Sequence, residues 1–270
     1  MTCWVLLRGL MREQRHWGAF PAQLARALPD AQIVTPDLPG NGTRHAQRSA
    51  TRVADMVESC RQYLQARGLR PPYALLALSL GGMVAVEWAS RYPHEIERCV
   101  LINTSMRPYS RFYERLRWRN YPAVLAQLAR GGIERQERLI LQLTSNGAGA
   151  ARSGGRADAD TAPAVAGVPA NRAPLLAQWT AYQREYPVTR PNVLRQLCSA
   201  ARYRAPAVLP PVPLLILTSA GDRLVDHRCS QRLAAAWNAP LAIHPHAGHD
   251  LPLDDGPWIV AQVANWLPQK

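Results

Sequence analysis

The sequence lacks any long hydrophobic run. No apolar stretch reaches the roughly 18 to 20 residues that a helix needs to cross a bilayer, so we expect no membrane span. The apolar residues at 3–7 are too few for the central region of a signal peptide, and no small-residue cleavage site follows them. We therefore expect a cytoplasmic protein.

Cysteine is scarce and scattered. The cysteines form no Cys-x-x-Cys pair and no cluster with histidine at the spacing of metal ligands. Their odd number and wide separation also fit a set of reduced thiols better than a disulfide framework. We expect no metal site, and we expect mostly buried, reduced side chains at Cys3, Cys60, Cys99, Cys198 and Cys229.

Acidic residues are outnumbered and lysine is almost absent. The chain has 32 basic and 19 acidic residues, a net charge of +13, and Lys270 is its only lysine. Such an excess can attract nucleic acid, a membrane surface or an acidic partner. The arginines are spread along the whole chain, however, and no basic run alternates with aromatic residues. We expect no nucleic-acid binding and attribute the arginine bias to genome composition.

Short apolar runs alternate with longer segments of helical period. The 270 residues, 47% apolar and 19% charged, suffice for one large domain. Runs typical of strands occupy 3–7, 31–35, 73–78, 98–102, 214–218 and 240–243. Helical patterns occupy 20–27, 52–67, 81–92, 227–237 and 257–267. This order predicts an α/β fold with a mostly parallel central sheet of about six strands and helices on both faces.

The alternation stops between the fourth and fifth strands. There about a hundred residues of helical character intervene, so we expect a core at 1–103 and 206–270 with an inserted helical lid at 104–205. Within the lid, residues 145–173 contain almost no large apolar side chain. Such a segment cannot repay the entropy of ordering, and we expect it to be flexible.

The third strand leads directly into Ala77-Leu78-Ser79-Leu80-Gly81-Gly82, where a helical pattern begins. A serine on such a tight turn projects its hydroxyl above the edge of the sheet. The Leu80 N–H at the start of the helix can then stabilise an oxyanion on a bound carbonyl. The usual motif has glycine where this chain has Ala77, and alanine is still small enough for the turn.

Two further strands end at groups that can activate a serine. Asp222 follows the fifth strand and His249 follows the sixth, so both lie at the same edge of a parallel sheet as Ser79. A hydroxyl needs an imidazole to take its proton and a carboxylate to orient that imidazole. Other candidates lie close by: Asp226, which falls where a helix should begin and is better suited to cap it, and His244 and His246.

A turn after the first strand, at Leu7-Arg8-Gly9-Leu10, can present the Leu10 N–H as a second oxyanion donor. With this turn, the sequence resembles the α/β-hydrolase superfamily, in particular small lid-bearing esterases similar to the pimeloyl-carrier-protein methyl ester esterases. The resemblance covers 1–103 and 206–270. It is carried by Leu10, the loop Asp37-Leu38-Pro39-Gly40, the elbow around Ser79, Gly221-Asp222 and Gly248-His249.

The resemblance implies a role for each of these side chains. Ser79 is the nucleophile, His249 the general base and acid, and Asp222 the residue that orients the histidine. Leu10 and Leu80 are the oxyanion donors, and no metal or organic cofactor is required. The first two strands common in the family are missing, so we expect a smaller sheet with an edge strand near Cys3.

Arg8 departs from the family, which usually has His-Gly where this chain has Arg8-Gly9. A guanidinium near the oxyanion site can bind a carboxylate of the substrate, which makes Arg8 a candidate substrate-binding residue. Alternatively, Arg8 pairs with a neighbouring acid such as Asp250 and supports the scaffold.

Arginines recur every four residues in the lid, at Arg111, Arg115 and Arg119, with Arg107 and Arg117 nearby. On one helix the first three share a face. This face is a candidate docking site for an acidic acyl-carrier partner, as the resemblance suggests. The alternative is a solvated basic face in an arginine-rich protein.

Together these features predict a carboxylesterase-like enzyme that cleaves ester, or thioester, bonds of a small acyl substrate through an acyl-serine intermediate. Acyl transfer to an acceptor other than water and hydrolysis of carbon–carbon bonds use the same triad and stay open. A non-catalytic ligand-binding member of the fold is a further alternative, because Arg8 and Ala77 depart from the family pattern. The serine at the elbow argues against the dehalogenases and epoxide hydrolases, which use an aspartate there.

Overall fold

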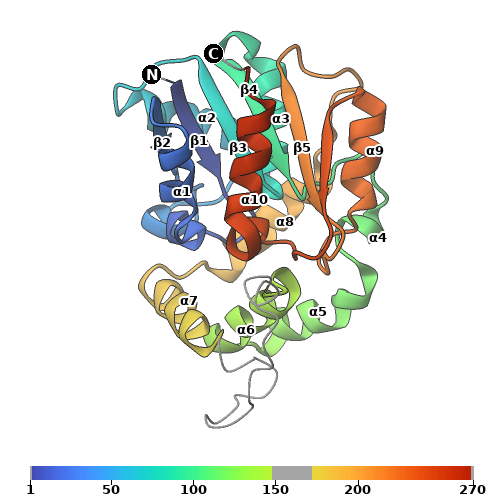
Figure 1. Ribbon diagram of the computed structural model, residues 1–270. Coiled ribbons are helices and arrows are strands. Elements are labelled where there is room, and N and C mark those ends of the chain that lie inside the picture. Colours follow the sequence, from blue (N-terminus) through green and yellow to red (C-terminus); the bar gives the residue numbers. More distant parts are fainter. Residues whose placement is uncertain (1, 148–171, 269–270) are drawn as a thin grey trace, which may run out of the picture.

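The computed structural model describes residues 2–147 and 172–268. Its centre is a six-stranded sheet of order β2-β1-β3-β4-β5-β6, in which every neighbouring pair is parallel (Figure 1). The α/β architecture and the six strands are thus confirmed. The strands are β1 (Thr2–Leu7), β2 (Ala31–Val34), β3 (Tyr73–Leu78), β4 (Ile96–Ile102), β5 (Leu214–Ser219) and β6 (Leu241–His244).

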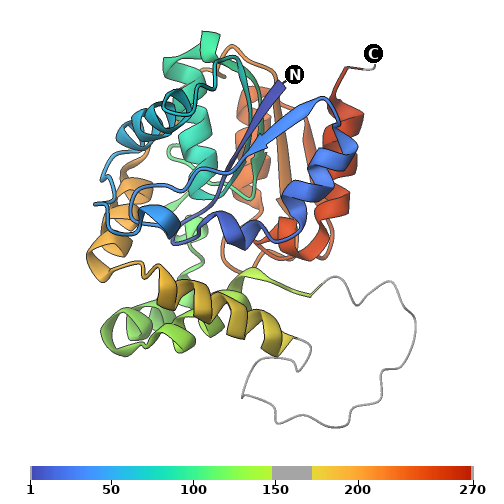
Figure 2. The same ribbon diagram turned by 90° about the vertical axis from the view of Figure 1, so that its left-hand side faces the viewer.

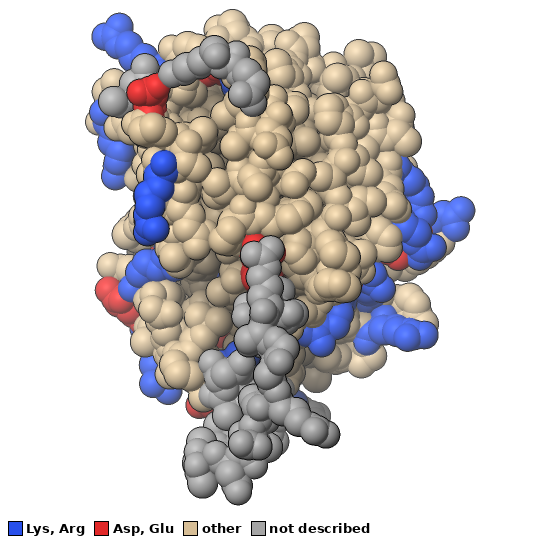
Figure 3. Space-filling model, in the orientation of Figure 1, with Lys and Arg blue, Asp and Glu red and all other residues tan. Residues whose placement is uncertain are grey.

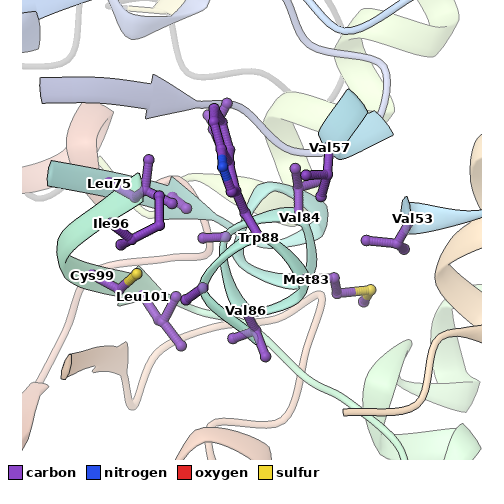
Figure 4. Close-up of a cluster of buried hydrophobic side chains, with 14 of the residues drawn as sticks. Val53, Val57, Leu75, Met83, Val84, Val86, Trp88, Ile96, Cys99 and Leu101 are labelled. Carbon is purple, nitrogen blue, oxygen red and sulfur yellow. The ribbon is translucent and has the colours of Figure 1, made fainter. Parts of the chain in front are cut away.

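Helices cover both faces of this sheet. One face carries α1 (Phe20–Ala27) and α10 (Leu251–Trp266), and the other carries α2 (Val53–Gln65), α3 (Leu80–Arg91) and α9 (Arg228–Trp237). Successive residues of β3 belong alternately to the two apolar clusters, because neighbouring side chains of a strand point to opposite faces. Figure 4 shows part of the α2–α3 side, where Trp88 packs among aliphatic side chains from these helices and the strands.

The edge of the sheet differs from the expectation. Cys3 lies on β1, which is the second strand, and the edge is formed by β2, where Gln32 pairs with Cys3. The expectation was wrong because it took the first strand of a shortened sheet to be its edge. The crossover through α1 instead places β2 outside β1, and β2 is only half-buried, as suits an edge strand.

The inserted segment forms a layer of helices across the carboxyl ends of the strands (Figures 1 and 2). The helices are α4 (Phe112–Arg115), α5 (Tyr121–Arg130), α6 (Ile133–Thr144), α7 (Ala173–Glu185) and α8 (Arg190–Arg202). Of the segment expected to be flexible, residues 148–171 lie outside the described residues. The flanking Ser145 and Asn146 are held by hydrogen bonds, and Ala173 begins α7.

A buried ion pair joins the lid to the core. Arg12, just after β1, lies 2.6 Å from Glu137 of α6, and both side chains are excluded from solvent. The Arg12 guanidinium also lies over the ring of Trp179 in α7, 4.6 Å from its centre. Trp179 packs with Leu141 and Leu176 in an apolar cluster of the lid. Removing one partner of a buried pair leaves an uncompensated charge, so the loss of either Arg12 or Glu137 alone is unfavourable.

His16 contacts Arg12 in this buried group, and its lowered pKa is expected to make stability depend on pH. Burial and the neighbouring charges of Arg12 and Arg8 hold the pKa of His16 well below its usual value. The folded protein therefore keeps this ring neutral, whereas the unfolded chain binds a proton below about pH 6.5, which favours unfolding in acid. Between pH 7 and pH 5.5, the wild type should lose about 1 kcal/mol of unfolding free energy relative to His16→Gln. Urea titrations of both proteins at the two pH values measure this difference, and a constant difference would contradict it.

Candidate active site

Ser79 lies on the strand-to-helix turn that its sequence context predicts. Its backbone angles, φ 56° and ψ −115°, are strained for a residue with a side chain. Three hydrogen bonds hold the turn. The Ser79 N–H donates to the carbonyl of Ile102 at 2.9 Å, and the Ser79 carbonyl accepts the Thr104 hydroxyl and the Gly82 N–H, each at 2.9 Å. The side chain lines a cavity at the edge of the sheet.

A close approach of helix and strand explains the small residues beside Ser79. A Cβ at Gly81 would lie 2.3 Å from the carbonyl oxygen of Leu7, so only glycine lets α3 begin this close to β1. Ala77, where the usual motif has glycine, is fully buried within β3. The alanine is therefore compatible with the elbow.

Asp222 and His249 meet, although they are 27 residues apart. The carboxylate oxygen Oδ2 of Asp222 accepts a hydrogen bond from Nδ1 of His249 at 2.7 Å, and both side chains are buried. The other carboxylate oxygen accepts the N–H groups of Leu224 and Val225 at 2.8 and 2.9 Å. This arrangement places the ring proton on Nδ1 and leaves Nε2 to act as a base. His249 lines the same cavity as Ser79.

Two of the other candidates, Asp226 and His244, have partners of their own. Asp226 accepts the Arg228 N–H at the start of α9, and its carboxylate pairs with the Arg228 guanidinium. These hydrogen bonds from Arg228 lower the pKa of Asp226 to about 2. His244 accepts the N–H groups of His246 and Ala247 at Nδ1 and lies 3.2 Å from Asp255 at Nε2. Asp226 and His244 therefore each stabilise a local turn or helix end, whereas the His246 side chain is exposed.

Asn103, which the sequence analysis did not single out, ties the loops together. It follows β4 with a φ of 44°, and its amide nitrogen donates to the carbonyl of His249 at 2.8 Å. Its amide oxygen accepts the N–H of Ser219 at 2.8 Å. Asparagine tolerates the left-handed conformation better than most residues. An asparagine directly after a predicted strand was therefore the signal that could have identified Asn103.

The end of α6 braces the loops of Asp222 and His249. The Asn146 side chain donates to the carbonyls of Gly221 and His246 at 2.8 and 2.9 Å. Asp254 accepts the Gly248 N–H at 2.7 Å and the Asn146 N–H at 2.8 Å. The contacts of Asn146 were missed because they join residues 75 to 108 positions apart, which leaves no local pattern.

Leu10 and Leu80 both line the cavity beside Ser79. Within the described residues neither of their N–H groups donates to another protein group. The turn that carries Leu10 lies directly against the serine, since a Cβ at Gly9 would be 3.2 Å from Cβ of Ser79. Two backbone donors are thus available next to the hydroxyl.

Arg8 makes a two-pronged ion pair with Asp250. Its two terminal nitrogens lie 3.0 and 2.6 Å from the carboxylate oxygens, and both side chains are 4% exposed. The guanidinium also lies 4.8 Å from the ring centre of Trp17. In this structure Arg8 therefore pairs with Asp250, as the second interpretation of Arg8 expected. The pair lies next to the loop that carries His249.

Replacing Arg8 should reduce stability rather than select among substrates. In Arg8→Ala, Asp250 keeps a buried charge without a partner, so the free energy of unfolding should fall by about 3 to 5 kcal/mol. Any loss of kcat/KM should be equal for neutral and acidic esters. The double variant Arg8→Met, Asp250→Leu removes both charges and should regain much of the stability. A rise in KM confined to acidic esters would instead make Arg8 a substrate contact.

The lid arginines do not share a helix face. Helix α4 ends at Arg115, because Leu116 is extended, with φ −136° and ψ 114°. The Arg115 guanidinium turns inward to the carbonyls of Ala200 and Ala201 at the end of α8. Arg111 instead contacts the Tyr113 hydroxyl. The expectation of one face failed because it assumed an unbroken helix. On the face shown in Figure 3, basic side chains lie on both flanks rather than in one patch.

The cavity has a volume of about 770 Å³ and lies between Ser79 and the lid. Its walls are mostly aliphatic, and α5, α6 and α8 contribute much of the lining, including Leu139, Ile140, Leu143, Val193 and Leu197. Within the described residues, no group of three His, Cys, Asp or Glu side chains is arranged to hold a metal ion. No helix in the same ranges is both long and apolar enough to traverse a bilayer.

Comparisons with known proteins agree with this architecture. The biotin biosynthesis bifunctional protein BioHC of Teredinibacter turnerae is 36% identical over 102 residues, which are 37% of this chain and 17% of that protein. RutD of Cronobacter sakazakii, provisionally named a carbamate hydrolase, is 27% identical over 91% of this chain and 82% of its own length. The enol-lactonase of Burkholderia xenovorans LB400 superposes with a TM-score of 0.73 at 15% identity, covering 99% of this chain and 92% of that one. The family model of the alpha/beta hydrolase fold matches residues 5–256, so this chain belongs to the α/β-hydrolase family.

Proposed function

We propose that this α/β-hydrolase is a serine hydrolase that cleaves carboxylic esters through an acyl-Ser79 intermediate. The observation that carries the proposal is the buried Asp222–His249 hydrogen bond of 2.7 Å, whose histidine shares a cavity with a serine on a strained turn. A general base oriented by a carboxylate, beside a hydroxyl and two backbone donors, is what acyl transfer to serine requires.

In the first half of the reaction, Nε2 of His249 takes the proton of the Ser79 hydroxyl while Oγ attacks the ester carbonyl. The oxyanion that forms accepts the N–H groups of Leu10 and Leu80. Histidine then gives its proton to the leaving alcohol as the carbon–oxygen bond breaks. In the second half, His249 deprotonates a water molecule that attacks the acyl-enzyme, and the acid product leaves with Ser79 restored.

The cavity supports a substrate with a sizeable apolar acyl group. Each buried methylene contributes about 0.8 kcal/mol, and the aliphatic walls provide room for several. A panel of p-nitrophenyl esters from acetate to decanoate tests both the activity and this preference. We expect kcat/KM for the octanoate to exceed that for the acetate by roughly 10- to 100-fold. Absence of turnover across the panel would contradict ester hydrolysis, and a preference for acetate would contradict the assignment of the cavity.

The leaving group and the acceptor define the remaining alternatives. Thioester cleavage, acyl transfer and carbon–carbon bond hydrolysis use the same three side chains, and the panel can be extended to acyl thioesters and to added acceptor alcohols. An acidic acyl-carrier partner is tested by comparing kcat/KM for a carrier-bound acyl chain with kcat/KM for its free methyl ester. Because the lid arginines lie on separate segments, they do not form the single helix face on which docking of an acidic carrier was expected.

A further inference from the structure

A glutamine of the lid reaches the turn that carries Leu10. Gln196, in the middle of α8, is fully buried, and its side-chain oxygen accepts the N–H of Met11 at 2.9 Å. Met11 directly follows Leu10 and is 185 positions away from Gln196 in the chain. An element outside the core therefore contacts the backbone next to the serine.

The orientation of the Gln196 amide is fixed by its neighbours. Its nitrogen donates to the side-chain oxygen of Asn41 at 2.8 Å and to the Ser49 hydroxyl at 3.0 Å. The Ser49 hydroxyl gives its own proton to the carbonyl of Pro39 at 2.8 Å, so its oxygen is the acceptor for Gln196. A backbone N–H can only donate, and the Gln196 oxygen must therefore face Met11.

The turn needs this support because it is strained. The backbone N–H of Arg12 donates to the carbonyl of Gly9 at 3.3 Å, which closes a four-residue turn, and Met11 has a φ of 60°. This conformation favours glycine at the third position, where the chain has a methionine. Rotation of the Leu10–Met11 peptide would relieve the positive φ, but it would turn the Leu10 carbonyl toward Gln196 in place of the Met11 N–H. Two oxygens would then face each other in a buried site.

We propose that Gln196 is a positioning residue that holds the Leu10 turn in the conformation of the oxyanion site, so that the lid supports transition-state binding. The inference rests on the proposed ester hydrolysis. Gln196 does not line the cavity. It acts through the Met11 N–H, and its loss should affect kcat more than KM.

The test measures the effect of Gln196→Met in two backgrounds, the wild type and Met11→Gly. It uses p-nitrophenyl octanoate as substrate and a trifluoromethyl ketone that mimics the tetrahedral intermediate. We expect kcat to fall by roughly 10- to 100-fold and ketone affinity to weaken in parallel, with KM changed less than about threefold. In Met11→Gly, where positive φ has no cost, the same substitution should lower kcat by only about threefold or less. An unchanged kcat, or an equal loss in both backgrounds, would overturn the proposal.

Gln183→Met provides the matched control. Gln183 is a buried glutamine of α7 whose oxygen accepts the Val188 N–H at 3.2 Å, and it lines no part of the cavity. Its replacement should leave kcat unchanged, and a loss as large as that of Gln196→Met would mean that general damage to the lid explains both.

Gln196→Glu keeps the proposal testable if Gln196→Met does not fold. A carboxylate retains the acceptor for Met11, and the Asn41 amide can turn its nitrogen, which has no partner within the described residues, toward it. This variant should keep kcat within about fivefold of the wild type, and a loss of 10-fold or more would overturn the proposal. If the wild type is active and Gln196→Met has the same kcat, only the positioning role of Gln196 is refuted. If the wild type is inactive, the proposed ester hydrolysis itself is refuted.

Discussion

Ser79→Ala is expected to reduce kcat by a factor on the order of 10⁵ to 10⁶ while the protein stays folded. The substitution removes the oxygen that forms the acyl bond, and no other hydroxyl occupies the strained turn between β3 and α3. Alanine is smaller than serine and leaves the hydrogen bonds of the backbone at this position in place. The unfolding free energy should therefore change by about 1 kcal/mol or less.

The control for this prediction lies on the same helix. Ser90 of α3 donates its hydroxyl to the carbonyl of Val86 and does not line the cavity, so Ser90→Ala should keep wild-type turnover. Initial rates with p-nitrophenyl octanoate and thermal unfolding of both variants provide the comparison. Retention of more than about a hundredth of kcat by Ser79→Ala would remove Ser79 as the nucleophile.

Asp222→Asn should lower kcat by a factor on the order of 10⁴. The N–H groups of Leu224 and Val225 both point at one carboxylate oxygen, so an asparagine there must turn its oxygen to them and its nitrogen to His249. The amide nitrogen donates to Nδ1 and forces the ring proton onto Nε2, which can then no longer accept the serine proton. A residue of the same shape therefore disables the base.

Asp226→Asn is the matched variant for this test. Asp226 is the other carboxylate after β5, and its partners are Arg228 and the start of α9. We expect its kcat within about threefold of the wild type, with some loss of stability from the weakened helix end. The opposite result, with Asp226→Asn inactive and Asp222→Asn active, would assign the orienting carboxylate to Asp226.

Local patterns were sufficient to predict the core. β3 and α1 have the expected bounds, and the remaining strands differ by one or two residues at their ends. Serine, aspartate and histidine each follow an apolar strand, and parallel strands bring their carboxyl ends together, so the Asp222–His249 contact could be anticipated. The catalytic roles themselves stay predictions until the variants are measured.

The last helix shows where local patterns fail. It begins at Leu251 rather than at 257, because the chain forms a first helical turn, kinks at Asp255 with φ −153° and ψ 70°, and is helical again beyond the kink, with Pro257 inside this second segment. Proline is common at the start of a helix, so the prediction began at Pro257. It therefore identified the second segment and missed the first helical turn. Asp254, which accepts the Gly248 N–H in the loop before His249, lies in this missed turn.

The lid and its contacts were largely beyond prediction. The helical character of 104–205 indicated helices but not the break after Arg115, where Leu116 is extended. The Arg12–Glu137 pair and the Gln196–Met11 bond join residues 125 and 185 positions apart. Such contacts arise from the packing of the lid on the core, and no periodicity in either segment marks them.

The central claim is that His249 makes the Ser79 hydroxyl reactive. Labelling with a fluorophosphonate, followed by intact mass and peptide mapping, measures this directly and does not depend on the natural substrate. We expect one adduct, on Ser79, formed on the order of 10³-fold more slowly in His249→Gln. A non-catalytic ligand-binding protein would not be labelled. An unlabelled Ser79, or a labelling rate that is the same with and without His249, would contradict the account.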